Sequence, residues 1–326
     1  MPEMRFLKTK DERLTDTLAY VKAKLSTVDW QEMVDEVNKL SAGQQSAIGG
    51  ILSLGATGSS DDRTTNREPR RAKRALMLAT RLFLTDPAFL AIELARVKVL
   101  PETSELDLLA ELRSWFILPG VTPGMVADDA LANIASMPNW QNVNVPPSLA
   151  VRGQYKQGAA YEFNCYNAVV FWAFQAGAIS RRFLFNKLHG QDGNHFFPVF
   201  SSCGWLTDIE YKLATPPELV TNKFGNGKWI VPKGMAVYFV TPHKVFGHVA
   251  LSLGDGRIIS QNAVIPAFPE NIKDEDRVAV TEMNHAKTHI IKIKHFWDIH
   301  YSPMNGYHKL QHTATGFWEA FLVAER

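Results

Sequence analysis

Residues 163–177 read FNCYNAVVFWAFQAG, and this stretch predicts the helix around which the chain is organised. Asn164 can cap a helix through its side-chain oxygen, and the apolar run that follows is long enough to form one. Gly177 supplies the left-handed residue that commonly ends a helix. Cys165 then falls in the first turn, where unpaired N–H groups and the helix dipole favour a thiolate and lower the pKa of the thiol. The stretch therefore predicts a helix that begins at a candidate nucleophile.

A cysteine in an apolar helix is more often a small packing residue than a nucleophile, so a second signal is needed. Residues 246–260 read FGHVALSLGDGRIIS, and their alternation predicts a strand with His248, Ala250 and Ser252 on one face. Gly254-Asp255-Gly256 predicts the hairpin turn that follows. A cysteine with a histidine distant in sequence is the pattern expected of a thiol nucleophile and its base.

Together with VPKGMAVYFV at residues 231–240, these segments resemble the three-part pattern of the NlpC-type cell-wall endopeptidases, a papain-like branch of the cysteine peptidases. In that family an Asp-Cys or Asn-Cys pair opens a helix ending in Ala-Gly, a Pro-Gly-Asp-like step leads into a strand, and a His-Val-Gly segment carries the base. The resemblance covers the second half of the chain. It implies a papain-like domain in which the nucleophile-bearing helix packs on an antiparallel sheet, with Cys165 as nucleophile and His248 as base.

The chain departs from the family pattern in several places. Asn164 stands where the family usually has Asp, and Tyr166-Asn167 replace a small Ser-Gly pair. Lys233-Gly234-Met235 lacks the usual acidic residue. The interval from Cys165 to His248 is longer than is typical of the family, so we expect an insertion between them.

The third catalytic residue should accept a hydrogen bond from the base and orient its ring. In the family this residue lies twelve positions after the base, which is Ser260 here, but serine is a poorer acceptor than the usual His, Asn or Gln. Asn262 shares its face of the strand, and Gln261 would need a bulge to turn inward. We rank Asn262 slightly above Gln261 and Ser260.

The resemblance also implies a tyrosine hydroxyl that helps the N–H of the nucleophile to hold an oxyanion. Tyr155 is the candidate, and Tyr161 is also near. An ordinary half-buried tyrosine is an equally good interpretation of Tyr155.

Length and composition allow two domains, because 326 residues with 46% hydrophobic content can bury a sizeable core. Helical spacing and caps predict helices in the N-terminal half, including one after an Asp29–Glu32 capping box and one opened by Asp86-Pro87. A Gly- and Ser-rich stretch at about 55–66 predicts a flexible loop. The expected fold class is therefore α+β: an all-helical module at 1–145 followed by a papain-like cysteine hydrolase domain at 146–326.

Charge and histidine content give little reason to expect nucleic acid, metal or an organic cofactor. The net charge is +2, and the basic run from Arg67 to Arg74 is more typical of a solvated helix start than of a binding patch. His285, His289, His295 and His300 lack the neighbouring carboxylate and regular spacing of a zinc site. Cys165 and Cys203 are expected to be free thiols.

The first residues contain no continuous apolar segment of signal-peptide or membrane-spanning length. We therefore expect synthesis in the cytoplasm without a signal peptide, no integral membrane segment, and release by a dedicated secretion system if the target is cell wall. That would fit an antibacterial effector whose partners are an immunity protein or a component of the secretion machine.

The resemblance implies a thiol-dependent hydrolase that cleaves an amide bond in peptidoglycan stem peptides, next to a D-glutamyl or diaminopimelate unit. Two alternatives stay open. The same thiol could serve a deamidase, transglutaminase or acyltransferase acting on a protein or lipid. The domain could also be a catalytically decayed binding module, which the weak orienting residue and the bulky Tyr166-Asn167 favour slightly.

Overall fold

The chain forms two compact units. The computed structural model describes residues 12–46, 48, 67–101, 104–137, 164–188, 206–211, 219–220, 231–240, 246–261, 288–293, 296 and 309–313. Contacts assign Met1–Ile117 and Ser180–Asn186 to the first unit, and Leu118–Ile179 and Lys187–Arg326 to the second. The chain thus leaves the first unit at Leu118 and returns to it for a single short segment.

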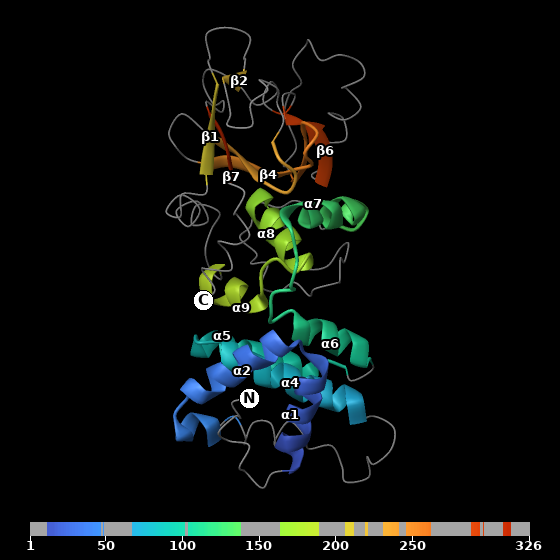
Figure 1. The fold of residues 1–326 in the computed structure, drawn as a ribbon, viewed down its shortest axis with the longest axis vertical. Helices are drawn as coiled ribbons and strands as arrows, with labels where there is room; N and C mark the ends of the chain where they lie inside the picture. The colour runs from blue at the N-terminus through green and yellow to red at the C-terminus, as the bar shows by residue number, and fades with distance from the viewer. Residues whose placement is uncertain are drawn as a thin grey trace. The chain divides into compact units, whose positions relative to one another are not determined.

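The described part of the first unit is helical. Its main helices are α1 (Glu12–Lys24), α2 (Thr27–Lys39), α4 (Arg67–Phe83), α5 (Pro87–Val99) and α6 (Glu105–Arg113) (Figure 1). The cap of α5 is as predicted, because the Asp86 carboxylate accepts from the N–H groups of Ala88 and Phe89. Helix α2 begins earlier than predicted: Ser26 caps it by accepting from the N–H of Asp29, so Asp29 lies inside the helix.

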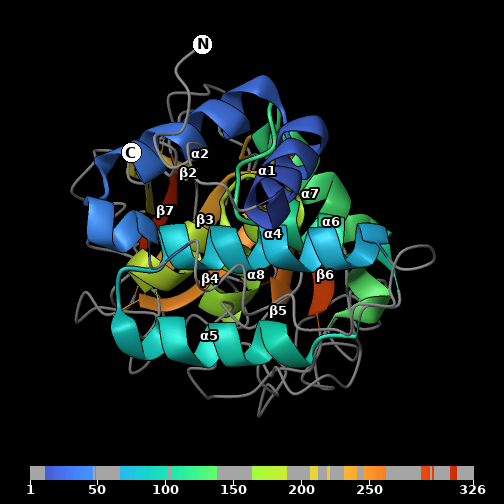
Figure 2. The same cartoon turned by 90° about the horizontal axis from the view of Figure 1, so that it is seen from below.

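Helix α4 is central to the packing of the first unit. It lies beside α5 (Figure 2) and also contacts α1, α2 and α6. Its apolar residues Ala75 to Ala79 are almost fully buried, whereas the basic run predicted on its first turns makes polar contacts. Arg71 donates to Asp16 and Glu68, and Lys73 donates to two backbone carbonyls at the end of α5. These cations therefore have partners within the unit.

The returning segment Ser180–Asn186 completes the core of the first unit. It begins with helix α9 (Arg181–Phe183) and runs into a π-helical turn, η4 (Leu184–Leu188). The Phe185 ring lies 6.0 Å from that of Trp115 and 6.2 Å from that of Phe89, measured between centroids. The side-chain amide of Asn186 donates to the carbonyl of Phe83 at 3.1 Å. Aromatic burial therefore ties this segment to α4, α5 and the end of α6.

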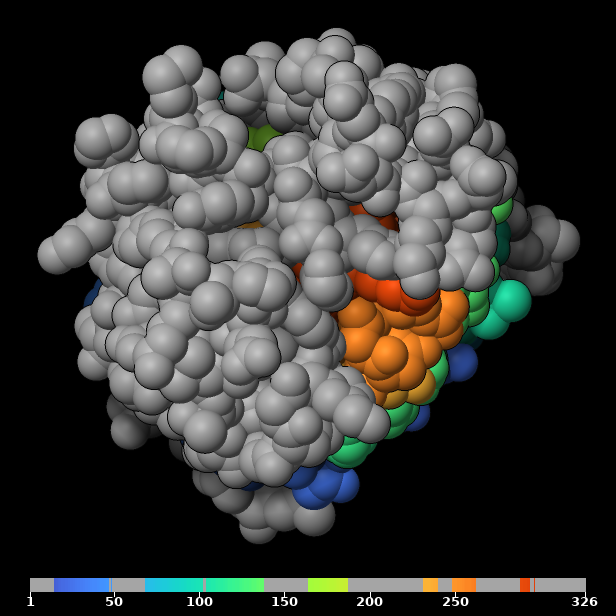
Figure 3. Space-filling view, turned by 90° about the horizontal axis from the view of Figure 1, so that it is seen from above, coloured from blue at the N-terminus to red at the C-terminus, as the bar shows by residue number. Residues whose placement is uncertain are grey.

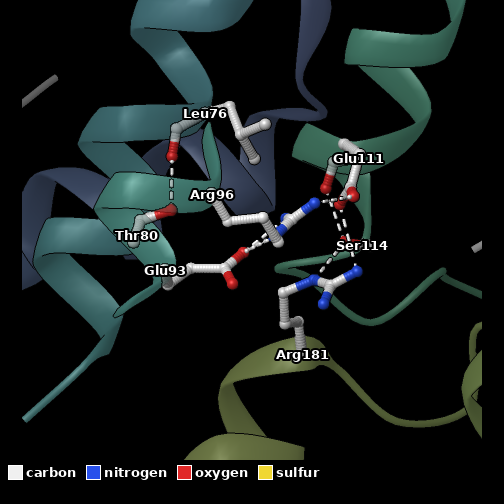
Figure 4. Close-up of polar contacts among 7 residues, drawn as sticks. All are labelled: Leu76, Thr80, Glu93, Arg96, Glu111, Ser114 and Arg181. Carbon is white, nitrogen blue, oxygen red and sulfur yellow. Dashed lines mark hydrogen bonds and ion pairs between the residues drawn. The ribbon is translucent and has the colours of Figure 1, made fainter. Parts of the chain in front are cut away.

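A buried group of charged residues also holds the segment in place (Figure 4). Arg181 has no exposed surface, and its Nη2 lies 3.0 Å from Oε2 of Glu111. Arg96 binds the other oxygen of Glu111 at 3.0 Å and also donates to Glu93. Burial works against the charge of Arg96, but the hydrogen bond with Glu93 and the attraction of Glu111 and Glu93 raise its pKa above the ordinary value. Two cations thus neutralise two buried carboxylates.

The second unit combines helices with an antiparallel sheet. Its helices are α7 (Pro123–Ala132), the 3-10 turn η2 (Ile134–Ser136) and α8 (Cys165–Gln175) (Figure 1). The strands are β1 (Leu206–Tyr211), β2 (Leu219–Val220), β3 (Ala236–Val240), β4 (Phe246–Ser252), β5 (Arg257–Gln261), β6 (Thr288–Lys292) and β7 (Lys309–Thr313). Among the described residues they form one sheet in the order β2-β1-β7-β3-β4-β5-β6, and every pairing is antiparallel.

Strand register fixes which side chains share a face of the sheet. Phe239 pairs with His248, and Tyr238 pairs with Val249. Because directly opposite residues point to the same side, His248 and Phe239 lie on one face and Tyr238 and Val249 on the other. A register irregularity follows Phe239, and helix α8 contacts β4 and β5.

The predicted step into β3 contains a turn that only glycine fits. Gly234 has a φ of 82°, and a Cβ built on it would lie 1.9 Å from the carbonyl oxygen of Pro123. The start of β3 therefore packs directly against the start of α7, and Lys233 pairs with Asp128 of that helix. The turn from β4 into β5 lies at the same end of these strands and reaches the surface beside β6 (Figure 3), and there Arg257 pairs with Asp255 at 2.6 Å.

The α+β fold class predicted from the sequence is confirmed at this level. Contacts place the division between the units at Ile117 and Leu118, which assigns α7 to the second unit. The predicted boundary at 145/146 and the predicted loop at about 55–66 lie outside the described residues. Within the described part of the chain, no helix is both long enough and apolar enough to cross a membrane.

Candidate functional site

Helix α8 begins at Cys165, as the sequence predicts. Asn164 has extended backbone angles, and its side chain accepts from the N–H of Asn167 at 3.0 Å. Every residue of α8 is buried, which agrees with its apolar sequence. Gly177, past the end of the helix, has a φ of 85°, and its carbonyl accepts from the N–H of Leu118 at 2.9 Å. The local signals therefore place the thiol at the first position of a fully buried helix.

The candidate base lies in the middle of the sheet. His248 is 5% exposed, and strand β4 runs between β3 and β5. Two phenylalanines pack against its imidazole: the Phe296 ring stacks on it with centroids 4.7 Å apart, and the Phe239 ring lies at 5.8 Å. Phe239 and Phe296 also contact each other, at 4.4 Å. The three rings therefore form one buried aromatic cluster.

The sulfur of Cys165 lies beside the peptide that joins His248 to Val249. The N–H of Val249 hydrogen-bonds toward the sulfur, as do the N–H groups of Tyr166 and of Cys165 itself. Helix α8 and strand β4 thus bring the thiol to the residue that follows the candidate base. Residues far apart in sequence therefore meet at the start of α8.

The pKa of Cys165 shifts in the direction opposite to the one expected from its place on the helix. Burial is the largest influence and raises the pKa from its ordinary value of 9.0 to about 11, although the three N–H groups act to lower it. The side chain is only 8% exposed. The sequence-based expectation of a lowered pKa is wrong because it counted the helix terminus and not the loss of water around the sulfur. In this state the group is a neutral thiol at neutral pH.

Ser260 lies within hydrogen-bonding distance of the candidate base. Its Oγ is 2.7 Å from Nε2 of His248, and both side chains are buried. Gln261, the next residue of β5, instead accepts through Oε1 from the hydroxyl of Thr288 on β6. Asn262, the residue ranked first from the sequence, lies outside the described residues. Of the three candidates for the orienting role, Ser260 is the one that the structure describes in contact with the imidazole.

Several other predicted residues lie outside the described part of the chain. These are Tyr155, Tyr161, Cys203, His285, His295 and His300. His289 is described, and it is a buried residue of β6 with 3% of its surface exposed. Among the described residues, no group of three or more His, Cys, Asp or Glu side chains is arranged to hold a metal ion.

The sequence did not single out Tyr238, which lies near Cys165, or Phe296, which stacks on His248. Tyr238 is 1% exposed, and its pKa is raised well above the ordinary value, first by burial and then by the nearby Cys165. Strand alternation could have placed Tyr238 on the face of its strand opposite to Phe239, but the register that sets Tyr238 opposite Val249 is seen only in the structure. Nothing local to Phe296 indicates that it stacks on His248.

Comparison of the chain with protein-family models, with curated proteins and with solved structures gave no match.

Proposed function

We propose that the second unit is a thiol-dependent hydrolase of amide bonds, with Cys165 as nucleophile and His248 as base. The observation that carries the proposal is the hydrogen bond from the Val249 N–H toward the Cys165 sulfur, which brings the thiol to the residue that directly follows His248 in β4. The contact between His248 Nε2 and Ser260 supports it further, because it gives the imidazole a partner that can orient the ring. A nucleophile, a base and a group that orients the base are the parts that such a reaction requires.

The raised pKa of Cys165 decides how the first step would run. A neutral thiol is a weak nucleophile, so its proton must pass to His248 as the sulfur attacks the amide carbonyl carbon. The new S–C bond displaces the carbonyl π pair onto oxygen. The N–H of Cys165 would stabilise that oxyanion, with the Tyr155 hydroxyl as the second donor that the family resemblance implies.

The remaining steps restore the thiol. The tetrahedral intermediate collapses to a thioester, and the amine leaves with the proton held by His248. His248 then takes a proton from water as the water oxygen attacks the thioester. The C–S bond breaks, the acid is released, and the sulfur recovers its proton. Water is the only co-reactant.

The proposed substrate is a peptide stem of bacterial peptidoglycan. The ground is the resemblance of the three segments at 163–177, 231–240 and 246–260 to the NlpC-type endopeptidases. With this substrate, the protein would serve as an antibacterial effector that a dedicated secretion system delivers and an immunity protein neutralises.

Mass analysis of digested wall fragments tests the chemistry. Purified muropeptides would be incubated with the wild type, with Cys165→Ala, and with Cys203→Ala as the matched control that removes the other thiol. The proposal expects two products whose masses sum to substrate plus one water, from wild type and Cys203→Ala only. Equal cleavage by Cys165→Ala would refute it, and a product carrying an added amine would indicate acyl transfer instead of hydrolysis.

A test in cells addresses the effector role. The protein would be expressed in bacterial cytoplasm and, in parallel, exported to the periplasm, with Cys165→Ala as control. Lysis only on export, and only with the thiol present, is the expected result. Harmlessness in both compartments would count against a wall substrate.

The burial of Cys165 favours a second candidate, a binding module on a decayed peptidase scaffold. A thiol that is 8% exposed with a pKa of about 11 is also what an inert packing residue would have. Binding of muropeptides that is unchanged in Cys165→Ala, without cleavage by the wild type, would decide for this candidate.

A further inference from the structure

Strand β6 places a second histidine next to the residue that contacts the proposed base. His289 pairs directly with Ser260 in the ladder between β5 and β6. The Cβ atoms of directly opposite residues in an antiparallel pair lie about 4.5–5.5 Å apart. His289 is 3% exposed and Ser260 has no exposed surface, so bulk water does not compete at this position.

The three side chains share one face of the sheet. Leu251 pairs with Ile259, and continuing this register by one residue sets Ala250 opposite Ser260. Ala250 and His248 are two residues apart on β4 and therefore point to the same side. On the other face, the next pair of the same ladder is Gln261 with Thr288. One serine hydroxyl thus has an imidazole on each side, one from β4 and one from β6.

The Ser260 hydroxyl has a single hydrogen, and this limits which ring nitrogen of His248 can act as the base. A hydroxyl has one hydrogen to donate and two lone pairs to accept with. If Ser260 donates to His248 Nε2, the neutral ring carries its hydrogen on Nδ1 and cannot take the thiol proton there. If Ser260 instead accepts from Nε2–H, its own hydrogen must point elsewhere, and Nδ1 is the basic nitrogen. The direction of one O–H bond therefore selects the tautomer of His248.

We propose that His289 is a positioning residue that accepts the Ser260 hydrogen and so holds His248 as the Nε2–H tautomer. This deepens the proposed function, on which its catalytic consequence rests. The imidazole of His289 acts through Ser260 and touches neither substrate nor sulfur in this scheme. By accepting the Ser260 hydrogen, His289 would allow Ser260 to orient His248. The NlpC-type family uses a stronger hydrogen-bond acceptor than serine at this position.

The tautomer of His248 can be measured directly on the full chain without substrate. Two-bond ¹⁵N–¹H correlation spectra distinguish a protonated from a bare ring nitrogen, and a His248→Gln variant assigns the signals. The wild type should carry its hydrogen on Nε2. Finding that hydrogen on Nδ1 would overturn the proposal, and this outcome does not depend on how any His289 variant folds.

Variants of His289 supply the second measurement. His289→Leu removes the acceptor and should move at least about half of the His248 population to the Nδ1–H tautomer, because the Ser260 hydrogen then turns to Nε2. His289→Gln keeps a side-chain acceptor and should restore the wild-type spectrum. Lys292→Gln, an exposed residue of the same strand, is the control for general effects on β6. A folded His289→Leu variant with an unchanged tautomer would overturn the proposal.

Kinetics on wall fragments separate this inference from the proposed function. His289→Leu should lower kcat at least about tenfold with little change in KM, since a correctly protonated base contributes about 10²–10⁴-fold to such a step, and His289→Gln should recover most of the loss. If the tautomer responds but the wild type cleaves nothing, the proposed function fails and the positioning role stands. If the wild type cleaves but the tautomer does not respond, the positioning role fails alone.

Discussion

Oγ of Ser260 lies 2.7 Å from Nε2 of His248, and the two side chains come from neighbouring strands of one sheet. Both are buried, and the imidazole packs against the rings of Phe239 and Phe296. The contact therefore has a stabilising role whether or not the site is catalytic, because a buried ring nitrogen without a partner is costly. Stability and activity have to be measured separately to assign its function.

Replacing Ser260 with Ala should destabilise the protein by about 1–3 kcal/mol, because Nε2 of His248 loses this partner in a buried place. Ser252→Ala is the matched control, since its buried hydroxyl donates to the carbonyl of Val231 at 2.7 Å on the same face of β4. Denaturant unfolding should show similar losses for both variants. Only Ser260→Ala should also slow cleavage of wall fragments; equal slowing by Ser252→Ala would remove the special role of Ser260.

The thiol of Cys165 should react slowly with a mild alkylating reagent near neutral pH. A pKa raised from 9.0 to about 11 keeps the group protonated, so the thiolate fraction should be about 100-fold lower than that of an ordinary thiol. In a Cys203→Ser background, the alkylation rate should rise about tenfold per pH unit until the pH approaches 11. A rate that is already at its plateau near pH 7 would instead indicate a stable thiolate–imidazolium pair.

Substituting Gly234 with Ala should disrupt the junction between β3 and α7. The new Cβ would meet the backbone of Pro123 at 1.9 Å, and the residue also has a φ of 82°. We expect a loss well above 2 kcal/mol, or no folded protein. Gly120→Ala is the control, because it has a φ of 76° but nothing within 4 Å of the added Cβ, and it should cost only about 1–2 kcal/mol. Similar melting temperatures for the two variants would contradict the predicted clash.

Removing the charge of Glu111 should destabilise the first unit by about 3–5 kcal/mol. Glu111→Gln weakens two buried ion pairs at once, those with Arg96 and Arg181. Lys39→Ala is the control, because its ion pair with Glu36 lies at the surface and should contribute at most about 1 kcal/mol. Thermal unfolding of both variants checks the contrast. If Glu111→Gln melts like the wild type, the buried group contributes little net stability.

A fragment that stops at residue 145 should not fold like the first unit of the intact chain. It lacks Ser180–Asn186, and with that segment it loses Arg181 and the packing of Phe185 on Trp115. We expect weak hydrogen-exchange protection in α4 and α6, and partial recovery when a peptide spanning 178–188 is added. Full protection of the fragment alone would show that the returning segment is dispensable.

Local features of this molecule could be predicted from the sequence. The start of α8 at Cys165, the caps of α5 and α8, the strand carrying His248 and the turn before β5 each depend on residues within a few positions of one another. Alternation along β4 also predicted that His248, Ala250 and Ser252 share one face of the strand, and all three are buried. These features can be predicted without knowledge of the fold, because the hydrogen bonds that cap helices and close turns join residues that are neighbours in the chain.

The sequence could not decide which distant groups meet. It ranked Asn262 above Ser260, because an amide is the better acceptor, but the contact seen at His248 is made by the Ser260 hydroxyl. It also gave no sign that residues 180–186 belong to the helical unit, since nothing around Arg181 indicates a carboxylate near Glu111.

The sequence by itself determined where the helix with the thiol begins, which strand carries the histidine and that helices and an antiparallel sheet coexist in one chain. Only the tertiary structure decided that the sulfur lies beside the N–H of Val249, that Ser260 is within reach of His248, and that the pKa of Cys165 is raised. The reason is the range of the forces: caps and alternation act between near neighbours, whereas burial of the thiol depends on every segment that excludes water from it.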